Sequence, residues 1–374
     1  MSNMGINRWQ MIQAGLLLLA VTASAVVFVG FFQQIPIESG AMAIDWKKIW
    51  PAIEGGTVRY AAGIIMNPPW SALLVSPLGL LSMRASWGLL AFITTLVLII
   101  SVPRTPRRGR YWLSILLLVM SFPALRHMID GNFEVLIISG AVLTVAGYRQ
   151  RRAWILAAGL LLIASKPQSG TLMIVMIGLY ALLDLRHAET RSFWLKTGGL
   201  VAAVAVPFLL WKGAEWLDAM LSIPERSSIM DVSLMSALNR SGWLGSAVIM
   251  VIWLAFVAAN LVIGWATRTS LSREKAGMFI AASLLIAPYA SGNSILTVMA
   301  VAIIPLFIAR PLLGLILIAM IDCLFFWNRE MLFQYQAYFQ TLTLLVMWLV
   351  LAWRVMSGQD EPLRKTLPVA ASTR

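Results

Sequence analysis

The chain has 374 residues, of which 60% are hydrophobic and only 12% are charged, and its net charge is +13. Soluble domains carry about 25% charged residues. A soluble fold of this length therefore could not bury so much apolar surface, and we expect lipid to surround most of the chain.

The excess of Lys and Arg does not indicate a nucleic-acid partner. These residues lie in short clusters between apolar runs, and that pattern orients membrane proteins. The single cysteine, Cys323, allows no internal disulfide. The two histidines, His127 and His187, are too few and too far apart in the sequence to indicate a metal site.

Apolar segments follow one another along almost the whole chain. Since about 20 residues cross a bilayer, we predict an all-α, polytopic transmembrane bundle of about 12 spans over residues 1–356. We expect a disordered cytoplasmic tail over residues 357–374. The predicted spans are 11–32, 85–102, 111–125, 134–147, 153–164, 171–184, 197–211, 246–265, 277–289, 293–309, 311–326 and 339–354.

The stretch 68–82 decides the topology. It is apolar but short, it begins with two prolines, and Pro77 interrupts it, so we predict that it does not cross. Most of the 29 Lys and Arg residues then lie on one side, which positive-inside bias assigns to the cytoplasm together with both chain ends. Residues 33–84 and 212–245 become outer loops of a protein of the inner (plasma) membrane.

The first outer loop contains the stretch Ile44-Asp45-Trp46-Lys47-Lys48-Ile49-Trp50. If this stretch is helical, Trp46, Ile49 and Trp50 share one apolar face. We therefore predict a membrane-parallel helix on the outer leaflet, with its tryptophans at the level of the headgroups. Asp45 is either the N-cap of this helix or a general base at the mouth of a cavity.

Charged residues gather at the predicted outer face, where membrane orientation does not require them. Arg126, His127 and Asp130 precede Gly131 and Asn132, and a plain turn needs only the last two. Both interpretations, a turn and a functional site, stay open for this segment.

Two further charged residues have alternative explanations. Lys166 lies between two short spans, where it is either a lysine that snorkels to the interface or a point-charge contact to a phosphate. Asp322 would be buried near the outer end of its span, so we expect it to pair with a basic neighbour.

A set of short motifs, in the same order and on the predicted sides, resembles glycosyltransferase family 87 over about residues 1–310. That family comprises GT-C-type membrane enzymes that use polyprenyl-phosphate sugars, commonly polyprenyl-phosphate mannose. The matching segments are Asp45-Trp46, Asn67-Pro68-Pro69, Gly131-Asn132-Phe133-Glu134, Ala158-Gly159 through Lys166-Pro167, and Ala287-Pro288-Tyr289.

The resemblance implies a GT-C-like fold and transfer of a hexose, commonly mannose, from a polyprenyl-phosphate donor. The acceptor would be a hydroxyl of a glycolipid or glycan on the extracytoplasmic face, and the transfer would be inverting, without metal or cofactor. The implied roles are a general base for Asp45, donor-phosphate binding for Lys166, Arg126 and His127, and substrate-site positions for Asn67, Asp130, Asn132, Glu134 and Asp322.

Two alternatives remain open at this point. A transporter or lipid flippase usually carries polar residues near the bilayer midplane, often with repeat symmetry. Here the unusual charges gather at one predicted face, and the sequence shows no internal repeat. The other alternative is a catalytically inactive membrane subunit.

Overall fold

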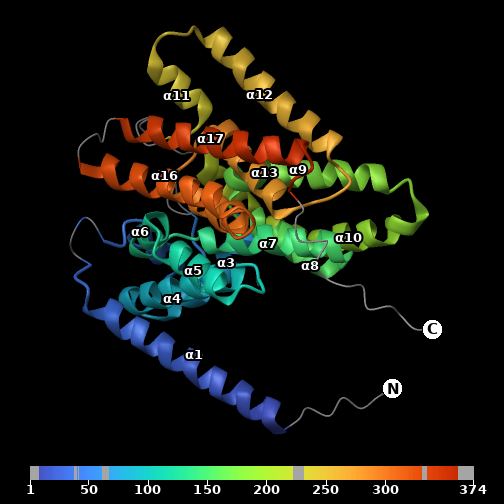
Figure 1. Cartoon of the computed structure of the whole chain (residues 1–374). Coiled ribbons are helices and arrows are strands. Elements are labelled where there is room, and N and C mark those ends of the chain that lie inside the picture. Colours follow the sequence, from blue (N-terminus) through green and yellow to red (C-terminus); the bar gives the residue numbers. More distant parts are fainter. Residues whose placement is uncertain are drawn as a thin grey trace.

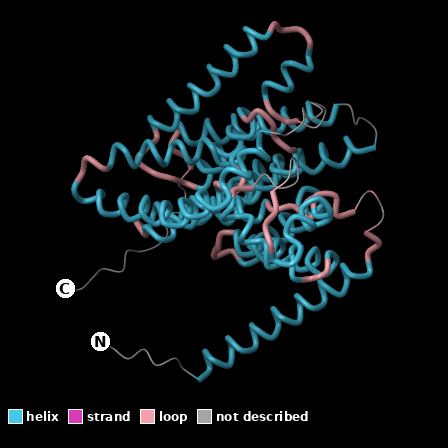
Figure 2. Tube along the Cα trace, turned by 180° about the vertical axis from the view of Figure 1, so that it is seen from behind, coloured by secondary structure: helices cyan, strands magenta, loops and turns pink. Residues whose placement is uncertain are grey.

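The computed structural model describes most of the chain as helix (Figures 1 and 2). Within the described part there is no strand, only an isolated bridge between Asp231 and Ser291, so the all-α prediction is confirmed. The predicted tail lies outside the described residues beyond position 360. The described residues are 8–37, 40, 42–60, 67–221, 231–330 and 335–360, with side chains described except at 8–10 and 324–330.

Helices occupy each of the predicted apolar segments. Among the described residues, seven helical stretches are long and apolar enough to cross a membrane, or up to eight if a pair bent by 47° is one span. The chain is therefore a multi-pass membrane protein, and the count of about 12 spans stays a prediction. The bent pair is α5 (Arg108–Val119) and α6 (Phe122–Asp130).

The seven stretches comprise six single helices and one broken helix. The single helices are α1 (Arg8–Gln34), α4 (Met83–Ser101), α9 (Pro167–Asp184), α10 (Ala188–Leu221), α12 (Ser246–Ala266) and α17 (Gln336–Met356). The broken helix consists of η4 (Gly292–Ser294), α14 (Ile295–Val298), η5 (Met299–Ile303) and α15 (Ile304–Ala309).

The centre of the bundle is formed by α13 (Arg273–Ile286) and the broken helix that follows it. Nearly every residue of α13 is buried, as expected for a helix that is apolar on all sides. In contrast, α1 and α12 lie at opposite edges (Figure 1). Leucines 16–19 of α1 are exposed, so they face the lipid.

Small residues allow α7 (Glu134–Gln150) and α8 (Ala153–Ile163) to pack closely. A Cβ atom on Gly159 would lie 2.5 Å from the backbone nitrogen of Thr144, and one on Gly140 would overlap the backbone of Ile163. Close approach of this kind at small residues is typical of membrane helices. The packing fixes α7, whose first residue belongs to the polar site described below.

The first predicted outer loop contains α2 (Trp46–Ile53), η1 (Glu54–Gly56), α3 (Pro69–Val75) and η2 (Ser76–Leu80). The stretch that we predict not to cross is α3 with η2, and it is too short to span a bilayer. The second predicted outer loop contains α11 (Leu234–Ser241), and its residues 222–230 lie outside the described ranges.

The amphipathic helix α2 is present, but its apolar face packs against protein. Trp46 and Ile53 are fully buried, although we predicted that this face would lie on the outer leaflet. The indole N–H of Trp46 donates to the carbonyl of Met83 and to the Ser86 hydroxyl, both at 3.1 Å. An amphipathic pattern identifies the buried face without distinguishing lipid from protein, and the membrane-parallel orientation stays a prediction.

Candidate active site

The polar site is built around α6 and the turn that follows it. Ser121 caps the start of this helix, since its hydroxyl accepts from the N–H of Ala124, and Gly131, with φ +72°, caps its end. A Cβ atom on Gly131 would lie 2.5 Å from that of Trp46. Both the left-handed conformation and the lack of space therefore require glycine here.

The deepest carboxylate is Glu134, the first residue of α7, whose side chain is fully buried. It forms an ion pair with Lys166. The Ser294 hydroxyl donates to its Oε1 at 2.6 Å, and the Thr297 hydroxyl donates to its Oε2 at 2.5 Å. These contacts supply the charge partner and the hydrogen bonds that a buried carboxylate needs.

A second carboxylate, Asp130, is also buried and lies at the C-terminal end of α6. Its Oδ2 accepts from Nε of Arg126 at 2.8 Å and from the amide of Asn293 at 3.4 Å. Its Oδ1 is buried and has no hydrogen-bond partner within the part of the chain that the structure describes.

The third carboxylate, Asp45, stands at the N-cap position of α2, but its side chain makes no capping hydrogen bond. Its Oδ2 accepts from the amide of Asn132 at 2.7 Å, and its backbone N–H donates to the carbonyl of Asp130 at 3.0 Å. Among the described side chains it has no cationic partner. It is the carboxylate of this cluster that is free of an ion pair.

His127 contributes a second buried atom without a partner. Its Nε2 accepts from the backbone N–H of Glu134 at 3.1 Å, so this geometry assigns the ring proton to Nδ1. Nδ1 is buried and lacks a partner in the described residues. Buried polar groups are nearly always paired, so this N–H and Oδ1 of Asp130 are groups that a ligand or an ordered water would satisfy.

Lys166 lies at the N-cap position of α9, and its ammonium group also donates to the Ser294 hydroxyl at 2.9 Å. Asn67 supports the turn that carries Lys166, because its amide donates to the carbonyl of Ser165 at 2.7 Å. In turn, the Tyr60 hydroxyl donates to the carbonyl of Asn67 at 2.8 Å. Burial raises the pKa of Tyr60, so this donor stays protonated.

Asp322, on α16 (Pro311–Glu330), is the predicted site residue that does not join the cluster. It accepts from the N–H of Phe122 at 3.0 Å, at the other end of α6 and about 12 Å along the helix from Asp130. No basic side chain among those described pairs with it, contrary to our expectation. The reason is that the first N–H groups of α6 need an acceptor, and a carboxylate is favourable there.

Sequence reasoning missed Asn293, Ser294 and Thr297. The only signal for them was a polar run, Ser291–Ser294, between two apolar segments.

The described part of the second predicted outer loop is held beside this run by a hydrogen bond. Oδ1 of Asp231 accepts from the N–H of Ala290 at 2.9 Å.

An apolar cavity of about 580 Å³ lies directly behind the cluster, between α1 and the helices α4, α5 and α6. Leu125, Met128 and Ile129 line it from one face of α6. The spacing of an α-helix places Arg126, His127 and Asp130 on the opposite face. Helix α6 therefore lies between the apolar cavity and the polar cluster.

Within the described residues, no group of three or more His, Cys, Asp or Glu side chains is arranged to hold a metal ion. The family model of glycosyltransferase family 87 matches residues 66–292, which is more than half of the chain. The match contains most of the cluster, whereas Asp45, Asn293, Ser294 and Thr297 lie outside it. No significant match was found among curated proteins or among solved structures.

Proposed function

Since the chain belongs to glycosyltransferase family 87, a family of membrane glycosyltransferases, we propose that it transfers a hexose, in the first instance mannose, from a polyprenyl-phosphate donor. The acceptor is a hydroxyl of a glycolipid or glycan on the extracytoplasmic face. The observation that supports this most is the distribution of charge partners in the cluster. Asp130 and Glu134 are each paired with a cation, whereas Asp45 is not.

Asp45 is therefore the proposed base. Glu134 is fully buried and both of its oxygens accept hydrogen bonds. Asp130 is buried and held by Arg126. An acceptor hydroxyl therefore reaches these two carboxylates less readily than Asp45. Asp45 is only partly buried, so an acceptor hydroxyl can reach it. The amide of Asn132 fixes one of its oxygens and leaves the other for the proton.

Arg126 and His127 are the proposed ligands of the donor phosphate, with Lys166 beside them. Arg126 uses its Nε on Asp130, but a guanidinium has five N–H donors, so others remain for a phosphate. The unpartnered Nδ1–H of His127 adds a donor. The buried Oδ1 of Asp130 suits a sugar hydroxyl, which can donate to it.

The polyprenyl chain fits the apolar cavity on the other face of α6. Because its lining includes α1, whose leucines face lipid, a lipid tail can enter it from the membrane. For a donor held there to reach Arg126 and Asp45, its phosphate and sugar would extend past the end of α6 to the polar cluster on the opposite face.

The reaction is then a single displacement. The acceptor oxygen forms a bond to the anomeric carbon while the bond from that carbon to the phosphate oxygen breaks. The hydroxyl proton moves to Asp45, and the electron pair of the broken bond leaves with polyprenyl phosphate. Cations and N–H donors aimed at the leaving phosphate stabilise the charge that develops there. The configuration at the anomeric carbon is inverted.

Comparison of glycolipids by mass spectrometry, from cells with and without this chain, tests the proposal. We expect cells that lack the chain to lose a glycan species and to accumulate the same species with one hexose fewer. Return of the chain on a plasmid should restore it. Identical glycolipid and glycan profiles in the two cell types would contradict the proposed function.

A further inference from the structure

A second cavity, of about 690 Å³ and lined in part by arginines, lies at the far end of the bundle. Helix α7 extends from the active site to this cavity. Glu134 is its first residue, and Arg149 lies in its last turn. Fifteen residues of helix place the two about 22 Å apart. The cavity is thus a site separate from the active site, and the proposed transfer does not use it.

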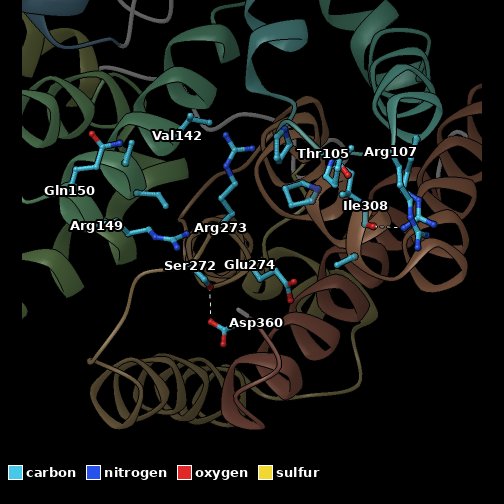
Figure 3. Close-up of a pocket in the computed structure, with 17 residues that line it drawn as sticks. Thr105, Arg107, Val142, Arg149, Gln150, Ser272, Arg273, Glu274, Ile308 and Asp360 are labelled. Carbon is cyan, nitrogen blue, oxygen red and sulfur yellow. Dashed lines mark hydrogen bonds between the residues drawn. The ribbon is translucent and has the colours of Figure 1, made fainter. Parts of the chain in front are cut away.

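Arginines from α7, from α13 and from the segment just before α5 line this cavity. Figure 3 shows Arg149 of α7 and Arg273 of α13 extending into it, with Arg107, just before α5, across from them. Arg149 and Arg273 both line the cavity, so they bring two positive charges to it. Arg273 donates to the carbonyl of Ser101, whereas Arg149 makes no hydrogen bond or ion pair within the described residues.

The acids in the wall do not neutralise these arginines. Glu274 is turned away (Figure 3), and both of its oxygens accept from Arg354, at 2.5 and 3.1 Å. Asp360 accepts from the Ser272 hydroxyl at 2.6 Å and forms no ion pair with the arginines of the cavity among the described contacts. Like charges held together without a counter-charge favour an anionic ligand.

Much of the rest of the lining is apolar, although Thr105, Arg110 and Gln150 also contribute to it. Val142 and Val145 of α7 and Pro305 and Ile308 of α15 belong to its apolar part. The volume falls in the range of sites for drug-sized ligands, so it exceeds the need of a single small anion. This lining matches the headgroup of a membrane lipid: the arginines suit its phosphate, and the apolar side chains suit the glycerol end next to it.

We propose that this cavity binds the phosphate headgroup of an anionic membrane lipid, with Arg149 and Arg273 contacting the phosphate. Arginine is suited to this role, because its planar donors match the oxygens of a phosphate. The predicted sidedness assigns this lipid to the cytoplasmic leaflet.

Binding of phosphatidylglycerol to the purified, delipidated full-length chain tests this proposal by native mass spectrometry. Arg149→Gln removes a charge-assisted hydrogen bond to the phosphate, so we expect its affinity for the lipid to fall about tenfold. We expect a larger loss when Arg149→Gln is combined with Arg273→Gln. Arg152→Gln is the matched control, because Arg152 is an exposed arginine three residues beyond Arg149 that does not line the cavity. It should bind as the wild type does.

The single variant keeps the test valid if the double variant fails to fold, since the side chain of Arg149 is exposed and makes no described hydrogen bond. Equal binding by Arg149→Gln and Arg152→Gln would overturn the site. Inorganic phosphate is the second probe, and we expect it to bind far more weakly than the lipid. If it bound as tightly as phosphatidylglycerol, the ligand would be free phosphate, and the assignment to a lipid would be wrong.

Discussion

Replacing Asp45 with asparagine is expected to abolish sugar transfer while the fold is retained. Asparagine has the same shape and can still accept from Asn132, but its amide cannot take the proton of the acceptor hydroxyl. Loss of a general base costs about 10²- to 10⁴-fold in rate. Membranes that contain the variant, supplied with a radiolabelled polyprenyl-phosphate sugar, should therefore form almost no labelled product.

Glu54→Gln is the matched control for this experiment. Glu54 lies at the other end of α2 and is exposed, so its replacement removes an acid from the same helix without touching the cluster. We expect this variant to transfer sugar at the wild-type rate. Full activity in Asp45→Asn would remove Asp45 from the role of base.

Glu134→Gln is expected to lower the stability of the protein strongly. The variant leaves the ammonium group of Lys166 without its carboxylate, and the Lys166 side chain is only 14% exposed. Breaking a buried pair by removing one partner costs about 3–5 kcal/mol. Thermal unfolding of the purified protein in detergent should show a clearly lower midpoint.

A double variant separates the structural role of this pair from its chemical role. Glu134→Gln with Lys166→Met removes both charges, which is often close to neutral in stability, so most of the lost stability should return. Transfer should not return, because Lys166 is a proposed contact of the donor phosphate. A stable double variant that transfers sugar would show that the pair is purely structural.

Glu215→Gln provides the control for the loss of an acid from an ion pair. Glu215 pairs with Lys212 at the surface, and half of its side chain is exposed. Exposed pairs contribute little, so the unfolding midpoint should hardly change. A drop similar to that of Glu134→Gln would indicate that burial of the pair does not determine the effect.

The helices could be predicted well, because apolar length and positive-charge clusters are properties of local sequence. Most of the site could also be predicted, since Asp45, the turn around Gly131 and Lys166 carry charge where membrane orientation does not require it. The structure brings these residues into one cluster. The sidedness of the cluster stays a prediction.

Other features could not be predicted because they depend on tertiary contacts. Ser294 and Thr297 are ordinary hydroxyl residues of an apolar segment until Glu134 is placed beside them. The apolar face of α2 could have met either lipid or protein, and only packing decides between them. Similarly, membrane orientation explains why Arg149 and Arg273 lie at the ends of two separate helices, but not why both line one cavity.

The most direct test of sugar transfer is an assay of the purified chain alone in liposomes, with a labelled polyprenyl-phosphate hexose and a glycolipid acceptor. We predict that the labelled hexose appears on the acceptor and that this requires no other protein. If no labelled acceptor forms and the intact donor lipid moves from one leaflet to the other, the proposed transferase activity would be contradicted and the protein would be a flippase.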